Sequence, residues 1–213
     1  MNWTFKNIIP HTFSEKNIIN SNVWNKEFTL APNQNYQINS PSGKGKSTFT
    51  AFCYGLRNDF KGDILLNKES INTISSEKWA ALRAKSIAIV PQQLQLFPNL
   101  TILENLLLKN NLTQHKTHAS ILSFIKALDI EECKDKKAKN TSFGQQQRAA
   151  IIRAILQPFS TLIMDEPFSH LDKNNMAIAQ ELISKETRLQ NANLIVTSLH
   201  EKPLLFNATP IHL

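Results

Sequence analysis

The sequence predicts an α/β protein with a mostly parallel β-sheet. Two observations support this. Apolar stretches typical of strands alternate with stretches of helical periodicity, and a glycine-containing loop joins one such strand to one such helix. Alternation of this kind places helices on the faces of a parallel sheet. The five expected strands are residues 28–30, 36–39, 86–90, 160–164 and 194–199.

Helical patterns fill the segments between these strands. They cover about 46–56, 75–85, about 117–128, 145–157 and 174–190. From about 92 to 145 the chain has helical patterns and no convincing strand, so we expect a helical insertion subdomain there. Together with a core at about 1–91 and 146–213, it would form a single domain of 213 residues.

Composition and charge narrow the class of protein. Cys53 and Cys133 lie far apart in the sequence, so neither a disulfide framework nor a zinc site is indicated. The net charge of +7 permits an anionic partner, but the positive residues are scattered along the chain. The one dense run of lysines, at 134–139, is interpreted as a solvated face. The chain shows no signal-peptide pattern and no apolar stretch of membrane-spanning length. We therefore expect a cytoplasmic protein, or one attached to the inner face of a membrane.

Residues 39–48 read NSPSGKGKST and are similar to a phosphate-binding loop that lacks its first glycine. In the pattern G-x-x-x-x-G-K-[ST], Ser40 stands at the first glycine, and Gly45, Lys46 and Ser47 stand at their own positions. A phosphate would bind the free N–H groups at the start of the following helix. Lys46 would reach the outer phosphates, and the Ser47 hydroxyl would ligate Mg²⁺. The alternative is a glycine turn in a lysine-rich segment.

The stretch TLIMDEP at 161–167 is an apolar run that ends in two adjacent carboxylates. At the end of a buried strand, Asp165 would hold Mg²⁺ near the phosphate loop, usually through a water molecule. Because successive side chains alternate along a strand, Glu166 would point elsewhere, where it could polarise an attacking water. The alternative is a strand that ends in an acidic turn.

A third pattern, TSFGQQQRAAIIRAIL at 141–156, combines a Ser-x-Gly-Gln turn with a long amphipathic helix. Ser142 and the backbone of Gly144 would face an anion at the start of this helix. The alternative is an ordinary N-capped helix with Ser142 as its cap.

Together these segments resemble an ABC-type ATPase domain. The family's signature LSGGQQQR is similar to TSFGQQQR at 141–148, its Walker B motif and D-loop are similar to LIMDEPFSHLD at 162–172, and its Q-loop resembles VPQQLQLFPNLTILEN at 90–105. The motifs occur in the family's order and cover nearly the whole chain. The resemblance implies a P-loop NTPase with a RecA-like core, an antiparallel β part at the N-terminus and a helical subdomain.

The resemblance also implies functions for individual residues. The chain would hydrolyse ATP with Mg²⁺, Glu166 would be the general base, and His200 would contact the γ-phosphate. Gln92 would sense the attacking water and would hold Mg²⁺ together with Ser47 and Asp165. The residues expected to bind nucleotide, in one subunit or across a dimer, are Ser40, Pro41, Ser42, Gly43, Lys44, Gly45, Lys46, Ser47, Thr48, Ser142, Gly144, Gln145 and Asp172.

The chain departs from the family pattern at several positions. Thr141 and Phe143 replace a leucine and a glycine of the signature, and His170 replaces an alanine of the D-loop. A small residue such as Ser40 suffices at the first glycine position if its φ is negative. We expect the loop to bind nucleotide, because its remaining residues stand in a chain that carries all the companion motifs.

Adenine stacks on an aromatic ring upstream of the phosphate loop in this family. Phe13 is the candidate here, with His11 behind it. Trp3, Phe5 and Trp24 are instead expected in the core, on alternating strand positions.

The resemblance favours an ATP-binding subunit of an ABC transporter. It would act as a head-to-tail homodimer or heterodimer on a separate membrane permease, at the cytoplasmic face of the cell membrane and without nucleic acid. The stretch at 94–108 would form either a groove for a permease helix or internal core. The run at 71–92 is similar to lipoprotein-releasing, macrolide-export and FtsE-like ATPases.

Two other functions stay open. One is a non-transport ABC ATPase that acts on a protein or nucleic-acid assembly. The other is a nucleotide-binding regulator that hydrolyses ATP poorly, to which Ser40, Phe143 and His170 point.

Overall fold

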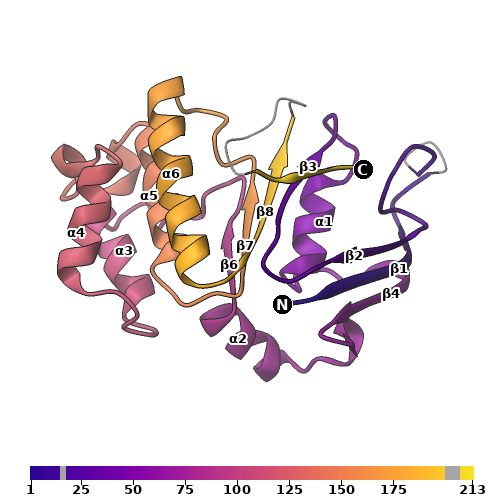
Figure 1. Cartoon of the computed structure of the whole chain (residues 1–213). Helices are drawn as coiled ribbons and strands as arrows, with labels where there is room; N and C mark the ends of the chain where they lie inside the picture. Colours follow the sequence, from indigo (N-terminus) through magenta and orange to yellow (C-terminus); the bar gives the residue numbers. More distant parts are fainter. Residues whose placement is uncertain (15–17, 200–206) are drawn as a thin grey trace.

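The computed structural model describes residues 1–14, 18–199 and 207–213, and its strands form two sheets (Figure 1). The parallel sheet has the strand order β6-β7-β8-β3-β9, and all of its neighbouring strands are parallel. The antiparallel sheet has the order β2-β1-β4-β5. The strands are β1 (Trp3–Pro10), β2 (Glu27–Leu30), β3 (Asn35–Asn39), β4 (Phe60–Leu66), β5 (Glu69–Ser70), β6 (Ile87–Val90), β7 (Thr161–Asp165), β8 (Asn193–Ser198) and β9 (Thr209–His212).

Most of the helices begin at a side-chain cap. The α-helices are α1 (Lys46–Cys53), α2 (Ser76–Lys85), α3 (Ile102–Asn110), α4 (His118–Ala127), α5 (Phe143–Ile155) and α6 (Lys173–Leu189), and short 3₁₀ turns cover Ile71–Thr73, Glu131–Cys133 and Ala138–Asn140. Before each helix from α2 to α6 stands a residue whose side chain accepts an N–H of the first turn. These caps are Ser75, Thr101, Thr117, Ser142 and Asp172.

The two faces of the parallel sheet belong to two apolar cores. In β7, Leu162 and Met164 pack with α5 and α6, whereas Ile163 packs with the core that contains α1 and the antiparallel sheet. This alternation follows from the two-residue period of a strand. Figure 1 shows the arrangement: α5 and α6 lie on one side of β7 and β8, and α1 lies on the other, near β1 and β4.

The predicted fold class and the five predicted strands are confirmed. Residues 28–30 form part of β2, and the other four segments form β3, β6, β7 and β8. The helix expected over 46–56 is shorter, because it ends at Cys53 and Gly55 then takes a left-handed φ of 67°. Trp3 and Phe5 are buried at alternating positions of β1, as expected, whereas Trp24 is buried but lies in a turn rather than on a strand. The sequence analysis had not assigned β4, β5 and β9.

Between residues 92 and 145 the described backbone consists of helices, turns and an isolated β-bridge from Thr101 to Lys137. Figure 1 shows α3 and α4 at the end of the molecule opposite β1, β2 and β4. The lysines of the 134–139 run are exposed, apart from the half-buried Lys134, which agrees with a solvated face. Cys53 and Cys133 are free, buried thiols. None of the described helices combines the length and apolar character that crossing a membrane requires.

Candidate active site at the phosphate loop

The loop at residues 40–45 lies between β3 and α1, with its glycines where the backbone needs them. Gly43 and Gly45 have φ angles of 77° and 101°, a region that L-residues rarely adopt. Ser40 is buried and is not among the residues with positive φ. Its N–H donates to the carbonyl of Ser198 at the end of β8, 3.4 Å away. A serine therefore fits the backbone at the first glycine position.

The start of α1 is suited to an anion. In the described part of the chain no side chain caps this helix, and its first turn carries no acidic residue. The N–H groups of the first turn are therefore open to a phosphate. A Cβ added to Gly43 would meet no atom within 4 Å, so the space beside the loop is free. Ser47 is exposed, whereas the Thr48 hydroxyl accepts a hydrogen bond from Arg57.

Lys46 connects the phosphate loop to the carboxylates of β7. Its buried ammonium donates to the carbonyl oxygens of Ser40 at 2.6 Å and Pro41 at 3.1 Å. It also lies 3.5 Å from Oε1 of Glu166. Two motifs separated by about half the chain thus meet at the carboxyl end of the parallel sheet, where α/β folds bind ligands.

Asp165 and Glu166 are both held by Thr197 of β8. The Thr197 hydroxyl donates to Oδ1 of Asp165 at 2.6 Å and accepts the N–H of Glu166 at 3.0 Å. Glu166 was expected to point elsewhere than Asp165, and its carboxylate contacts Lys46 of the phosphate loop. Glu166 has a φ of 51°, so it ends the strand and no longer follows the alternation. The sequence analysis had missed Thr197, because its position opposite Asp165 depends on the pairing of β7 with β8.

The start of α5 has the capping geometry that the sequence allowed. The Ser142 hydroxyl accepts the N–H of Gln145 at 3.2 Å, and the Gln145 side chain accepts the N–H of Ser142 at 2.9 Å. This capping box presents Ser142 at an exposed helix start. Gly144 lies against the D-loop, since a Cβ there would come within 3.2 Å of the His170 carbonyl oxygen.

The D-loop is tied to the same network. The Gln147 side chain donates to the carbonyl of Glu166 at 3.3 Å and accepts the N–H of His170 at 3.2 Å. Asp172 caps α6 by accepting the N–H of Asn175 at 2.9 Å. That hydrogen bond lowers the pKa of the exposed Asp172 carboxyl.

Three further predicted site residues stand as follows. Gln92 is exposed and follows the carboxyl end of β6, which pairs with β7. The half-buried Phe13 ring packs edge to face on Trp24, with the ring centroids 5.4 Å apart. Its Cζ lies 2.5 Å from where a Cβ on Gly45 would stand, so Phe13 touches the phosphate loop. His200 lies outside the described residues.

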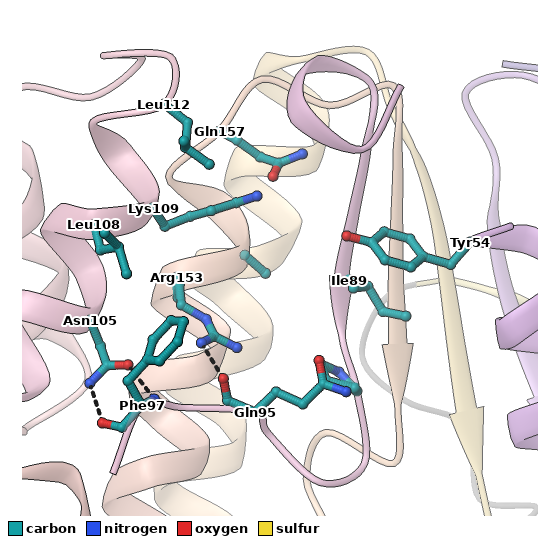
Figure 2. Close-up of a pocket in the computed structure, with 12 residues that line it drawn as sticks. Tyr54, Ile89, Gln95, Phe97, Asn105, Leu108, Lys109, Leu112, Arg153 and Gln157 are labelled. Carbon is teal, nitrogen blue, oxygen red and sulfur yellow. Dashed lines mark hydrogen bonds between the residues drawn. The ribbon is translucent and has the colours of Figure 1, made fainter. Parts of the chain in front are cut away.

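A groove of about 290 Å³ opens between α3, α5 and the segment after β6 (Figure 2). Its lining contains no residue of the phosphate loop or of β7. The groove is lined by Tyr54, Ile89, Pro91, Gln95, Phe97, Asn105, Leu108, Lys109, Leu112, Arg153, Ala154 and Gln157. Leu94, predicted for either groove or core, is buried, while Phe97 and Leu108 are exposed at the groove.

The parallel sheet, the phosphate loop and the two carboxylates define the class of a P-loop ATPase. The family model for the ABC transporter matches residues 23–169. The chain belongs to the ABC transporter family, and it is an ATP-binding subunit that hydrolyses ATP.

Similar proteins include the lipoprotein-releasing system ATP-binding protein LolD of Buchnera aphidicola subsp. Acyrthosiphon pisum. It is 30% identical over 86% of this chain and 85% of its own length. The spermidine/putrescine import ATP-binding protein PotA of Haemophilus influenzae is 32% identical over 90% of this chain and 51% of its own length. Among solved structures, the dimeric cassette MJ0796 has a TM-score of 0.83 at 22% identity and covers 100% of this chain and 94% of its own. This last likeness concerns the fold alone.

Proposed function

We propose that this chain drives a separate membrane permease by hydrolysing ATP, from the cytoplasmic face of the cell membrane. The observation that carries the proposal is the 3.5 Å contact between Lys46 of the phosphate loop and Glu166 after β7. An ammonium group that would bind phosphates and a carboxylate that would accept a proton from the attacking water meet there. The names of the relatives support a transport function, since LolD belongs to a releasing system and PotA to an import system.

The phosphate loop suits a nucleotide bound with Mg²⁺. Lys46 would exchange the carbonyls of Ser40 and Pro41 for phosphate oxygens, and the open N–H groups of α1 would bind the same phosphates. Ser47, Asp165 and Gln92 would together be the protein ligands of Mg²⁺. When bound, Mg²⁺ neutralises phosphate charge. Phe13 would stack on adenine beside Gly45.

Glu166 would accept the proton of the attacking water. Its place is set by the backbone bond to Thr197 and by the φ that ends the strand. Thr197 also holds Asp165, so a single hydroxyl orients both carboxylate residues. Such positioning accounts for most of the catalysis in phosphoryl transfer. The proposed contact of His200 with the γ-phosphate would complete the site.

A head-to-tail pair of subunits would complete the nucleotide site. Ser142, Gly144 and Gln145 stand at the exposed or half-exposed start of α5, where N–H groups and dipole favour an anion. In a pair, this helix start would face the phosphates that the other subunit holds, and Asp172 would couple the two sites. ATP would then close the pair and hydrolysis would let it open.

The helices between about 92 and 145 would form a subdomain that contacts the permease. The groove supports this, because its lining joins that segment to Arg153 and Ala154 of α5, a helix that also contacts β6, and to Gln157 just after α5. The residues that follow Gln92 would transmit the conformational changes of the ATPase cycle to a permease segment in the groove.

Two measurements test the proposal. Purified wild type should hydrolyse ATP, and Glu166→Gln should lower the rate about 10²-fold or more. The matched control Glu181→Gln, on an exposed position of α6, should keep the wild-type rate. Equal, near-zero rates for wild type and Glu166→Gln would instead indicate a regulator.

The second measurement is capture of the Glu166→Gln form with ATP from detergent-solubilised membranes, followed by mass spectrometry. A polytopic membrane protein in stoichiometric amount supports the transport proposal. Recovery of only soluble proteins or nucleic acid contradicts it and supports the non-transport alternative.

A further inference from the structure

Arg57 connects the start of α1 to the segment that carries Phe13. It follows α1 in the sequence, and its guanidinium donates to the Thr48 hydroxyl, 3.2 Å away, in the first turn of the same helix. Asp59 comes two residues later, and its carbonyl accepts the N–H of His11 at 2.9 Å. His11 stands two residues before Phe13. Arg57 and Asp59 therefore link the first turn of α1 to the segment expected to bind adenine.

The Arg57 guanidinium is held in one orientation. Its Nε and Nη2 donate to the two carboxylate oxygens of Asp59 at 2.8 and 2.5 Å, and its Nη1 is directed at Thr48. Its centre lies 5.7 Å from the centre of the Phe52 ring. The hydrogen bond from Arg57 lowers the pKa of the Asp59 carboxyl, so the pair keeps both charges. A bidentate pair of this kind fixes the direction of the remaining donors.

The contact with Arg57 determines how the Thr48 hydroxyl can bind a ligand. A guanidinium carries only donors, so the Thr48 oxygen accepts, and the hydrogen of its hydroxyl is left for another acceptor. In the described part of the chain no protein atom accepts that hydrogen. An anion bound at the start of α1 is an acceptor that could take it.

The backbone of Thr48 presents a second donor at the same place. The first hydrogen bond within α1 runs from the N–H of Phe49 to the carbonyl of Gly45 at 2.8 Å. The N–H of Thr48 precedes it and has no partner within the helix. Thr48 thus offers an O–H and an N–H together, which is the donor pattern that suits a phosphate.

The position of Thr48 indicates which phosphate it would bind. Lys46 contacts Glu166, so the outer phosphates and the attacking water belong on that side of the loop. Thr48 is instead linked through Arg57 toward Phe13, the expected adenine platform. The phosphate between these two ends of the nucleotide is the one that adjoins the ribose.

We propose that Arg57 is a positioning residue for nucleotide binding, which holds the Thr48 hydroxyl as a donor to the phosphate that adjoins the ribose. The inference rests on the proposed function, because that function places a nucleotide at this loop. Arg57 acts through Thr48 and not by direct contact with the nucleotide.

The first experiment measures the Kd of the full chain for ADP and for ATP by isothermal titration. Thr48→Val removes the hydroxyl and keeps the side-chain shape, whereas Arg57→Gln removes the guanidinium. Each should weaken both Kd values about tenfold, because a hydrogen bond to a charged phosphate is lost or misdirected and both nucleotides carry that phosphate. The double variant should bind no more weakly than Thr48→Val alone.

A second variant and a control separate this function from stability. Arg57→Lys keeps the charge but lacks the fork that contacts Asp59 and Thr48 at once, so its Kd values should match those of Arg57→Gln. The matched control is Arg188→Gln on α6, where the exposed Arg188 donates to the Ser184 carbonyl at 3.3 Å. It should change neither Kd.

Phosphorus NMR of bound ADP gives a readout that a purely structural function would leave unchanged. In Thr48→Val and Arg57→Gln, the resonance of the phosphate that adjoins the ribose should shift, and the terminal phosphate resonance should stay in place. In Arg188→Gln both resonances should stay in place.

The outcomes separate this inference from the proposed function. If Lys46→Ala abolishes ATP binding but Arg57→Gln changes neither the Kd values nor the NMR signal, the inference is overturned and the nucleotide site stands. Additive losses in the double variant would also overturn it, because Arg57 would then act independently of Thr48. A wild type that binds neither ADP nor ATP would overturn both.

Discussion

The rings of Phe143 and His170 meet edge to face, with their centroids 4.3 Å apart and 60° between their planes. Phe143 begins α5 and His170 lies in the D-loop, so two of the three residues that differ from the family pattern in these motifs contact each other. The His170 ring also shares a hydrogen bond of 2.8 Å with the Ser169 hydroxyl. Ser169 in turn donates to the carbonyl of Glu166 at 3.2 Å. Phe143 and His170 therefore act as one unit that ties α5 to the segment after Glu166.

A double-mutant cycle should detect this unit. Phe143→Ala and His170→Ala should each lower the free energy of unfolding, and the double variant should lose less than the sum of the two. We expect a coupling energy of about 0.5–1.5 kcal/mol, typical of an aromatic pair. Urea unfolding of the four proteins measures it. The pair of Leu189→Ala with His170→Ala is the control, because Leu189 is 66% exposed on α6, and it should be additive. Additivity within about 0.5 kcal/mol for the first cycle would disprove the coupling.

Restoring the missing glycine should bring no gain in nucleotide affinity. Ser40 takes a backbone conformation open to any residue, and Lys46 bonds its carbonyl rather than its side chain. Ser40→Gly should change the Kd for ATP less than about threefold. It should also lower the free energy of unfolding by about 0.4–1 kcal/mol, because glycine gives the unfolded chain more freedom. Isothermal titration and urea unfolding check the two values, and a tenfold tighter Kd would show that the serine impairs the loop.

Gly45→Ala is the contrasting case in the same loop. Its φ of 101° and the 2.5 Å approach of Phe13 leave no room for a methyl group. We expect a loss of at least about 1 kcal/mol in the free energy of unfolding and weaker ATP binding. Unchanged affinity would mean that the loop adjusts its backbone when nucleotide binds.

The features predicted best from the sequence are those that depend on a short run of consecutive residues. The apolar run before Asp165 indicated a buried strand, and Ser142 indicated a helix start, because burial and capping leave patterns in consecutive residues. The antiparallel strands were harder to assign individually. Their pairs join Trp3 to Leu66, and the register of β1 against β4 shifts between Lys6 and Ile9. Such a bulge interrupts the alternation on which a strand prediction depends.

The contacts of the candidate site could not be predicted residue by residue. Thr197 reaches Asp165 because β8 pairs with β7, and Glu166 reaches Lys46 because its φ is positive. Both facts follow from the packing of distant segments. The sequence could indicate which side chains suit phosphate chemistry, but not which of them meet before nucleotide binds.

Stacking on adenine can be tested at Phe13 without removing its packing. Phe13→Leu keeps an apolar side chain against Trp24 and Gly45 but removes the aromatic face. We expect the Kd for ATP to weaken at least about fivefold, while the Kd for inorganic tripolyphosphate, which has no base, stays the same. Fluorescence competition measures both. The matched control is Phe28→Leu on β2, which should change neither Kd. Equal losses for ATP and tripolyphosphate would assign Phe13 to loop packing alone.

An ion pair joins the segment before α4 to α6, and its carboxylate is more deeply buried than its ammonium group. Lys116 lies 2.7 Å from Glu186, and their side chains are 17% and 4% exposed. Lys116→Met would leave the more deeply buried carboxylate unpaired, so we expect a loss of about 3–5 kcal/mol in the free energy of unfolding. Lys116→Met combined with Glu186→Leu should recover most of it, because two apolar side chains avoid the cost of burying charge. Urea unfolding at constant pH compares the variants. If the double variant is as unstable as Lys116→Met alone, the residues contribute through their shape rather than their charge.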